Sequence, residues 1–398
     1  MAISRRDVLL GSAGALGAAS FSFPAPAIAQ SETIKIGCLA AMTGPSSAPT
    51  IGFNRGVNFA VEAINGAGGV KGRKLEVIMR DTQGDPTKAV NATQEMISQL
   101  KVHAIWGPLN SGEALATTPI MARAKVPNIH PCVVETLIDT TKYPNAFRMA
   151  PSNSQWDDAV RNYCLNILKV KKIAVMGDTT GYGVTAVGAS VAAFKKDGAE
   201  VVYQANVDST QPDMTPDMLR AKNAGAEAIV VWSVSTGMEA RMFNVRAVMR
   251  WDVPFVGHPS MSSGEISGLV EKPENWKKVY AIGYKSCSYD AAGKLPPKSE
   301  DLVARLTKAG IKLDDTLLWW VAGGIDAVEL IARAVETSGS TDGAGIIAFL
   351  NGQSKYPGYF GNYSWSPTQH IGYLTEEVVM SEASTAKNGT FALAPGYT

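Results

Sequence analysis

A short apolar run that ends at Gly107-Pro108 is followed by a group of polar residues that could bind a ligand. Residues 102–106 have the composition of a buried strand, and Gly107-Pro108 ends that strand. Asn110 or Ser111 then begins a helix, with Glu113 at the spacing of a capping box. The first turn of a helix has unpaired N–H groups and partial positive charge, so this corner could hold a carboxylate or another polar head group. On this stretch alone, a plain strand–helix turn capped by Ser111 is the better interpretation.

The motifs typical of enzymes do not occur in a usable form. Gly181-Tyr182-Gly183 opens a predicted helix after a strand, but the third glycine, Gly188, is misplaced for a dinucleotide-binding loop. The sequence has no phosphate-binding G-x-x-x-x-G-K-[ST] loop and no G-x-S-x-G elbow. The histidines lack the spacing of metal ligands; they are His103, His130, His258 and His370. We therefore expect no catalytic residue, no metal and no cofactor, unless folding gathers distant residues into an active site.

The first residues have the pattern of an export signal. Arg5-Arg6 precedes the small, uncharged run 8–23, and Ala27-Ile28-Ala29 fits the small-x-small cleavage rule. The paired arginines favour a twin-arginine signal over a general secretory one. We expect residues 1–29 to be a signal peptide that is removed near Ala29, which would place the mature protein in the periplasm.

The net charge and the cysteine pattern limit which classes of partner and metal site the chain could have. The chain has 37 basic and 36 acidic residues, and removal of Arg5, Arg6 and Asp7 leaves 35 of each. A net charge of zero gives no indication of a nucleic-acid or anionic-membrane partner. The cysteines show no disulfide or metal pattern, and we expect buried free thiols at Cys38, Cys132, Cys164 and Cys287.

Strands and helices alternate along most of the remaining chain. This order predicts two α/β domains with parallel sheets, whose ligands bind beyond the carboxyl ends of the strands. After residue 280 the order changes to helices at 297–309 and 317–337 and closing strands at 356–363 and 370–379. The chain is therefore expected to pass between the domains more than once. The strands expected before that point are 33–40, 75–79, 102–106, 127–130, 172–178, 201–207, 228–232 and 255–257.

An ordered set of motifs between Ile34 and Tyr373 resembles a known family. The chain is similar to the periplasmic solute-binding proteins of branched-chain amino-acid-type ABC importers, which have the type I periplasmic binding fold. No single motif is specific, but their order and spacing are. The motifs are Thr43-Gly44-Pro45, Asn54-x-Gly56, Ile64-Asn65-x-x-Gly68-Gly69, Asp81-x-x-x-Asp85-Pro86, Gly107-x-x-x-Ser111 and Asp178-x-x-x-Tyr182-Gly183.

The resemblance implies two doubly wound, parallel-sheet lobes joined by a three-segment hinge. The hinge segments would lie near Met149-Ala150, Gly283-Tyr284 and Lys355. The N-terminal lobe would comprise residues 31–150 and 284–354, and the C-terminal lobe residues 151–283 and 355–398. Such lobes enclose a cleft that closes by hinge motion.

The resemblance also implies where a ligand binds. Ser111, with Asn110, Gly112 and the N–H groups there, would hold the ligand carboxylate, and Tyr182 would reach it from the second lobe. The family's usual disulfide is absent, because Gly84 occupies one of its positions and Asn110 the other. The further candidate ligand-binding residues are Cys132, Val134, Pro259, Ser260, Trp106 and Phe53.

Two departures from the family argue against an α-amino acid ligand. Val134 stands where amino-acid binders usually have a hydroxyl, and the segment 258–261 lacks the usual acidic residue. A buried ammonium without a counter-charge would cost several kcal/mol. An aliphatic or aromatic acid without an amine fits better, with Phe53, Trp106 and Tyr182 beside its tail. Trp232 is better explained as core.

The sequence therefore predicts a substrate-binding component of an ABC importer that takes a small carboxylate-bearing solute. Its partner would be an ABC permease in the inner membrane, and we expect it to be a monomer. A periplasmic ligand sensor of the same fold is the alternative, because it would use the same cleft. An exported enzyme is the less favoured reading.

Overall fold

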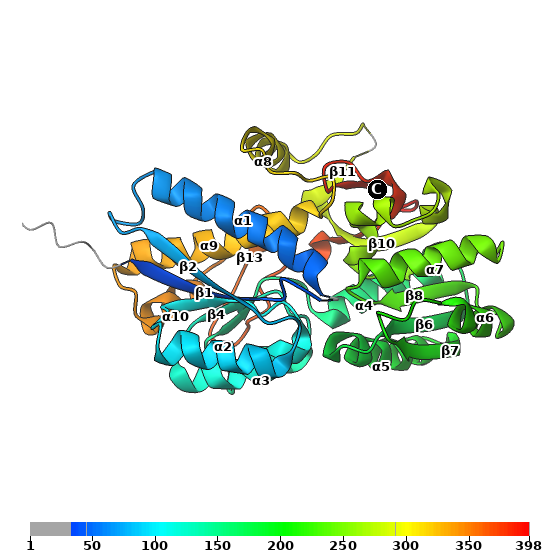
Figure 1. Ribbon diagram of the computed structural model, residues 1–398, viewed down its shortest axis with the longest axis horizontal. Helices are drawn as coiled ribbons and strands as arrows, with labels where there is room; N and C mark the ends of the chain where they lie inside the picture. The colour runs from blue at the N-terminus through cyan, green and yellow to red at the C-terminus, as the bar shows by residue number, and fades with distance from the viewer. Residues whose placement is uncertain (1–32, 45, 291, 398) are drawn as a thin grey trace, which may run out of the picture. The chain divides into compact units, whose positions relative to one another are not determined.

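The computed structural model describes residues 33–44, 46–290 and 292–397 of the chain (Figure 1). The predicted signal peptide and its cleavage position lie outside these residues. Within them the α/β class predicted from the sequence is confirmed, since helices alternate with mostly parallel strands.

The first sheet is entirely parallel, in the order β2-β1-β3-β4-β5. Its central strands are short apolar runs that are buried on both faces, as expected for a parallel sheet covered by helices. One face packs on α1 and α9, and the other on α2 and α3. Its strands are β1 (Ile34–Ala40), β2 (Leu75–Asp81), β3 (Ala104–Trp106), β4 (Asn128–His130) and β5 (Ala146–Arg148).

The second sheet has the order β14-β10-β9-β8-β6-β7. All of its pairs are parallel except β10 with β14, so the predicted parallel-sheet fold is confirmed, with one antiparallel edge strand that the prediction did not include. The closing strand lies beside β10 at the sheet edge, where an antiparallel neighbour needs no crossover. Its strands are β6 (Lys172–Asp178), β7 (Glu200–Val207), β8 (Ala228–Trp232), β9 (Phe255–Gly257), β10 (Val279–Tyr284) and β14 (Val378–Glu382).

The α-helices follow the strands in the expected order. Helix α10 was not predicted, although Asp342 caps it by accepting from the Gly345 N–H at 2.9 Å. The helices are α1 (Ser47–Gly66), α2 (Pro86–Ser98), α3 (Ser111–Ala124), α4 (Asn153–Asn162), α5 (Gly181–Lys196), α6 (Thr215–Asn223), α7 (Thr236–Val248), α8 (Pro297–Lys308), α9 (Leu318–Ser338) and α10 (Gly343–Asn351).

The chain passes between the two sheets three times. The first passage follows β5 and the second follows β10, close to the positions predicted. The third was predicted near Lys355, but Ile371 still pairs with Arg148 of β5, and the Gly372 N–H donates to the Arg148 carbonyl at 2.8 Å. The passage therefore lies between Tyr373 and the start of β14. The lobe boundaries themselves stay a prediction.

The two long closing strands predicted at 356–363 and 370–379 are wrong. The first stretch forms only a small antiparallel pair, β12 (Tyr356–Pro357) with β13 (Asn362–Tyr363). Most of the second has no strand structure before β14 begins. Its apolar residues pack against β5 and against aromatic neighbours, as in the contact of Ile371 with Arg148 and that of Tyr373 with Phe360, whose ring centroids are 4.7 Å apart. Burial by loop packing thus produced an apolar pattern that resembles a strand.

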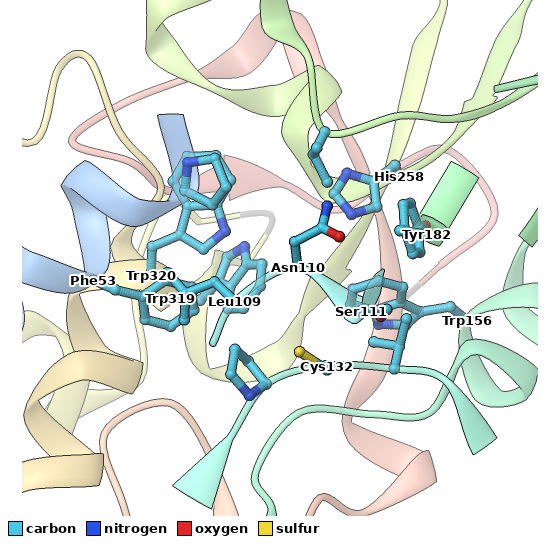
Figure 2. A pocket seen from close by; sticks show the side chains of 14 residues that line it. Phe53, Leu109, Asn110, Ser111, Cys132, Trp156, Tyr182, His258, Trp319 and Trp320 are labelled. Carbon is cyan, nitrogen blue, oxygen red and sulfur yellow. The ribbon is translucent and has the colours of Figure 1, made fainter. Parts of the chain in front are cut away.

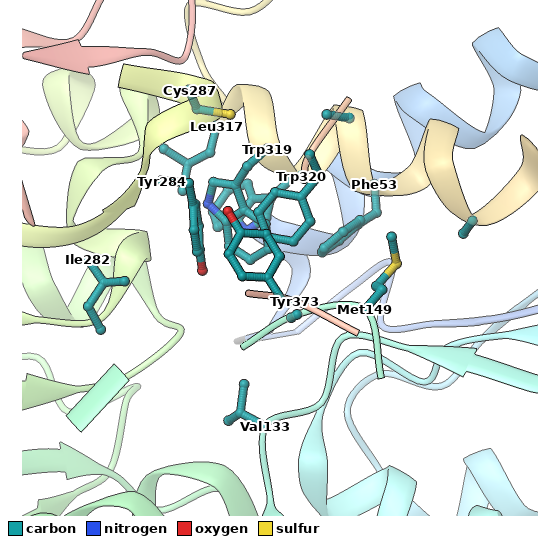
Figure 3. Packing of buried hydrophobic residues seen from close by; sticks show 14 of the residues in the cluster. Phe53, Val133, Met149, Ile282, Tyr284, Cys287, Leu317, Trp319, Trp320 and Tyr373 are labelled. Atoms are coloured by element: carbon teal, nitrogen blue, oxygen red, sulfur yellow. The ribbon is translucent and has the colours of Figure 1, made fainter. Parts of the chain in front are cut away.

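Helix α9 crosses α1 at very short range because both helices have glycine at the crossing. A Cβ on Gly56 would lie 1.9 Å from the Val321 carbonyl oxygen, and one on Gly324 would lie 2.1 Å from the Phe53 carbonyl oxygen. Only glycine allows this approach. The crossing places Phe53 beside the first turn of α9, in a buried aromatic cluster with Trp319 and Trp320 (Figure 3).

None of the helices among the described residues combines the length and apolar character needed to cross a membrane.

Replacement of Gly56 by alanine should separate α1 from α9. The added methyl overlaps backbone atoms that cannot rotate away, so we expect the free energy of unfolding to fall by about 1–3 kcal/mol, the usual cost of overpacking. Urea denaturation measures the change. Gly66→Ala, at the open end of the same helix with no atom within 4 Å of the new Cβ, is the control. Equal stability of the two variants would contradict the close-packing argument.

Candidate ligand-binding site

A pocket lies where the strand ends of the two sheets meet (Figure 2). Side chains from both sheets' helices and loops line it, so neither half forms it alone. The lining residues are Pro49, Phe53, Leu109, Asn110, Ser111, Pro131, Cys132, Val133, Trp156, Tyr182, Val234, His258, Trp319 and Trp320.

One wall is aromatic and comes from α1 and α9. Trp319 contacts Phe53 edge to face with ring centroids 5.6 Å apart, and it contacts Trp320 at 5.8 Å. Phe360 stacks behind Trp319 at 5.1 Å. Such mutual packing fixes the orientation of the rings and leaves an apolar surface toward the pocket.

The opposite wall comes from α4, α5 and the loop after β9. The His258 imidazole lies between Trp156 and Tyr182, with ring centroids 5.3 and 5.2 Å away. Burial raises the pKa of the Tyr182 hydroxyl well above its ordinary value, so this group stays neutral. Its oxygen is buried and has no hydrogen-bond partner among the described residues.

The polar corner predicted at the start of α3 is present, with a different cap. Asn110 Oδ1 accepts from the Gly112 N–H at 2.9 Å, so the predicted capping box with Glu113 is not what holds the turn. This bond orients the Asn110 amide so that its NH₂ group is free to donate. The Ser111 hydroxyl is buried and has no hydrogen-bond partner within the described part of the chain. Both side chains line the pocket.

Gly112 has a structural contact in place of the predicted ligand contact. Its N–H is taken by Asn110, and it does not line the pocket. Gly112 instead faces Gly181 at the start of α5. A Cβ added to Gly181 would lie 2.9 Å from the Gly112 Cα. The N-terminal turns of α3 and α5 therefore touch through two glycines at the edge of the pocket.

Charged side chains lie behind the pocket lining near Cys132. The Arg148 guanidinium is fully buried, and its only ion partner among the described residues is Glu135, at 3.8 Å. Burial lowers the pKa of Arg148 to about 10, so the guanidinium remains charged at neutral pH. Burial raises the pKa of the Cys132 thiol, Glu113 raises it further, and Arg148 lowers it.

The structure brings together some of the predicted site residues and leaves others outside. Phe53, Asn110, Ser111, Cys132 and Tyr182 line one pocket. Whether any of them binds a ligand stays a prediction.

The other candidates are placed behind the lining. Trp106 packs behind Phe53 at 5.3 Å, in the core of the first sheet. Val134 is buried away from the pocket, where its carbonyl accepts from Arg148. Pro259 and Ser260 lie one layer behind His258, which takes the place in the lining that was expected of them.

Sequence reasoning missed several lining residues. His258 directly follows the strand predicted at 255–257, a position at the carboxyl end of a strand that could have indicated it. Trp156 lies on α4, between the first and second sheets. Trp319 and Trp320 come from a helix far along the chain, and only the α1–α9 crossing brings them here.

The cysteines agree with expectation, because Cys38, Cys132, Cys164 and Cys287 are free and buried. The described residues include no cluster of His, Cys, Asp or Glu that could hold a metal.

Comparison with known proteins identifies the family. A family model for periplasmic binding proteins matches residues 33–375. The chain belongs to the periplasmic binding protein family. It is thus a periplasmic solute-binding protein, and the family is one of binding proteins rather than enzymes.

Relatives and solved structures agree with this. The Leu/Ile/Val-binding protein homolog 3 of Brucella melitensis is 25% identical over 333 residues, which are 83% of this chain and 85% of that protein. A branched-chain amino acid transporter substrate-binding protein from Streptococcus pneumoniae, in complex with isoleucine, has a TM-score of 0.76 at 23% identity, over 91% and 99% of the two chains. An ABC transporter solute-binding protein from Rhodopseudomonas palustris, in complex with p-hydroxybenzoic acid, has a TM-score of 0.75 at 23% identity, over 91% and 95%.

A buried carboxyl next to the site should make stability depend on pH. Burial raises the pKa of Glu113 to about 7, and the nearby Thr82 hydroxyl and Asn110 N–H oppose the rise only in part. The folded protein therefore holds this proton more tightly than the unfolded chain. The resulting stability is present at low pH and is lost between about pH 4.5 and 7, by up to about 3 kcal/mol.

Glu113→Gln replaces the carboxyl by a neutral group of the same shape. We expect the variant to gain stability relative to the wild type as the pH rises from 5 to 8, measured by urea denaturation. Other buried carboxyls, such as Asp326, titrate equally in both proteins and cancel in the difference. Parallel pH profiles for the two proteins would contradict this assignment.

Proposed function

We propose that this protein is the solute-binding component of an ABC importer and that its solute is a small aromatic carboxylate without an amine. The observation that carries the proposal is the character of the pocket lining. Its walls are largely aromatic, its polar groups are mainly hydrogen-bond donors, and no lining residue is a carboxylate.

The donors support an anionic head group. The Asn110 amide and the Ser111 hydroxyl stand together at the start of α3, where the helix dipole adds partial positive charge. The buried Arg148 cation lies behind the Cys132 side of the pocket. A carboxylate docked at this corner would meet hydrogen-bond donors. The positive charge of Arg148 is opposed there by Glu113 to the extent that this buried carboxyl is ionised.

No carboxylate near the pocket belongs to its lining, which argues against an ammonium group. Glu113, the buried carboxyl beside Ser111, has its pKa raised by burial to about 7, so it is only partly ionised at neutral pH. Asp157 is held by Arg161 at 2.8 Å. Asp178 accepts from the backbone N–H groups of Thr180 and Val234 at 3.0 and 3.1 Å. Glu239 is buried, with its pKa raised by desolvation, which favours its neutral form. An α-ammonium in this pocket would lack a counter-charge, at a cost of several kcal/mol.

The aromatic walls favour a ring over an aliphatic tail. Offset and edge-to-face ring contacts add roughly 0.5–1.5 kcal/mol beyond area burial. Trp319 and Trp320 face the pocket from one side, and Trp156 and Tyr182 from the other. The R. palustris structure holds p-hydroxybenzoic acid and the S. pneumoniae structure holds isoleucine. At such low identity neither decides the ligand, and the lining supports the aromatic acid.

The two sheets and their helices would act as lobes that close on the solute. We place the lobes at residues 33–150 with 284–373, and 151–283 with 378–397, and we place the third hinge segment at 374–377. The Gly112–Gly181 contact would form on closure and give the permease one closed surface to recognise. The protein would work as a monomer in the periplasm, after loss of residues 1–29, with an ABC permease of the inner membrane.

Ligand selectivity tests the proposal. The mature protein should bind benzoate and 4-hydroxybenzoate at least tenfold more tightly than phenylalanine or leucine, measured by isothermal titration calorimetry. The reason is the missing counter-charge for an amine, which is worth more than 1.4 kcal/mol, the equivalent of a tenfold change. Tight leucine binding with no response to benzoate would overturn the proposed ligand class.

The glycine contact between α3 and α5 tests closure. Gly181→Val should hold the two helix ends apart, so that benzoate dissociates about tenfold faster while its association rate changes little. Stopped-flow tryptophan fluorescence measures both rates. Gly188→Val, on the same helix with no atom within 4 Å of the new Cβ, is the control. Unchanged dissociation in Gly181→Val would show that this contact does not contribute to the closed state.

A further inference from the structure

We infer that His258 is a hydrogen-bond donor to the ligand through its Nε2–H, and that Ser260 and Glu239 act as positioning residues which fix that tautomer. The inference deepens the proposed function, on which it rests, by naming the second-lobe residue that selects for an acceptor group. The geometry of the His258–Ser260–Glu239 chain carries it.

The Nδ1 atom of His258 is already engaged. It accepts from the Ser260 backbone N–H at 3.1 Å, in the cap of the short helix η3 (Pro259–Ser262). The Ser260 hydroxyl oxygen lies 2.7 Å from the same atom. A ring nitrogen that accepts from an N–H cannot itself carry a proton, so in the neutral ring the proton sits on Nε2.

The Ser260 hydroxyl links this ring to a buried carboxyl. Ser260 Oγ lies 2.5 Å from Glu239 Oε1 and 2.9 Å from the Ser233 carbonyl oxygen. Glu239 and Ser260 are both fully buried. The hydroxyl has one proton, so it can donate to only one of its three neighbours.

A neutral Glu239 satisfies the whole chain of contacts. Its O–H donates to Ser260 Oγ, and the Ser260 hydroxyl then donates to His258 Nδ1. An ionised Glu239 would take the only hydroxyl proton and leave the lone pairs of Oγ and Nδ1 facing each other at 2.7 Å. Burial raises the pKa of Glu239 and lowers that of His258 to about 3, in agreement with two neutral groups.

The cap of η3 accounts for the hydrogen bond to His258 Nδ1 but gives no role to Nε2, on the other edge of the ring. His258 lines the pocket, held between Trp156 and Tyr182. A neutral imidazole with its proton on Nε2 offers a donor to that space and no acceptor. It therefore favours a carboxylate or carbonyl oxygen in the ligand and rejects an ammonium group, which is the selectivity proposed above.

The tautomer can be measured without any ligand. ¹⁵N-histidine NMR of the mature protein should show for His258 an unprotonated Nδ1 and a protonated Nε2, unchanged between pH 5 and 8. The chain has four histidines, and the signals lost in His258→Gln assign this one. A proton on Nδ1, or a charged ring, would overturn the inference.

Two matched variants test the donor. In His258→Gln the side-chain amide can reach the place of Nε2 and donate, whereas in His258→Asn it replaces Nδ1 and leaves the pocket without that donor. Benzoate affinity, measured by calorimetry, should fall roughly 10- to 100-fold in His258→Asn, the range for a hydrogen bond to a charged group, and only a few-fold in His258→Gln. Equal affinity of the two variants would overturn the inference.

Two further variants test the positioning role. Glu239→Gln keeps a neutral donor for Ser260 Oγ and should retain the wild-type tautomer. Glu239→Leu fills a similar volume without a donor and should weaken benzoate binding about tenfold and mix the His258 tautomers. An unchanged His258 spectrum in Glu239→Leu would show that Glu239 has no part in the positioning.

The outcomes separate this inference from the proposed function. If the NMR tautomer is as stated but the wild type binds no aromatic carboxylate, only the proposed ligand class fails. If benzoate binds but the tautomer is reversed, only the role of His258 fails.

Discussion

The short-range crossing of α1 and α9 is the contact on which the pocket depends. Gly56 and Gly324 let the two backbones approach to distances that a methyl group would forbid. The first turn of α9 then presents Trp319 and Trp320 beside Phe53 (Figure 3). One aromatic wall of the pocket is therefore built by residues more than 260 positions apart, brought together by close helix packing.

The polar character of the pocket depends on which buried side chains lack a hydrogen-bond partner. Both carboxylate oxygens of Asp178, by contrast, accept hydrogen bonds from backbone N–H groups. The groups without partners in the described chain include the Ser111 and Tyr182 hydroxyls, both of which line the pocket. Buried polar groups without partners are costly, so their gathering in one cavity favours a ligand that supplies acceptors.

The two halves contribute differently to that site. The first sheet supplies the helix-start corner and the α1–α9 wall, and the second supplies His258, Trp156 and Tyr182. The α3 and α5 helix ends meet through Gly112 and Gly181, so the halves can approach without side chains between them. A small solute could then be enclosed from both sides.

The sequence by itself determined the local elements and the family. Apolar runs of four to eight residues, separated by helical stripes, predict parallel α/β units because both periods reflect burial. Strands β1, β6 and β8 lie where expected, as does the corner at Asn110-Ser111. The missing acid at 258–261 was also visible, because it depends only on residue type.

Tertiary structure alone decided which residues share the pocket and where the chain makes its third passage between the sheets. Trp319 and Trp320 reach the site through a helix crossing that leaves no local pattern. The apolar stretch at 370–379 looked like a strand because loop packing and strand pairing bury the same residue types. His258 took the place expected of its two neighbours because its ring, fixed by Ser260, turns toward the cavity. These outcomes depend on distances between remote segments, which residue order does not encode locally.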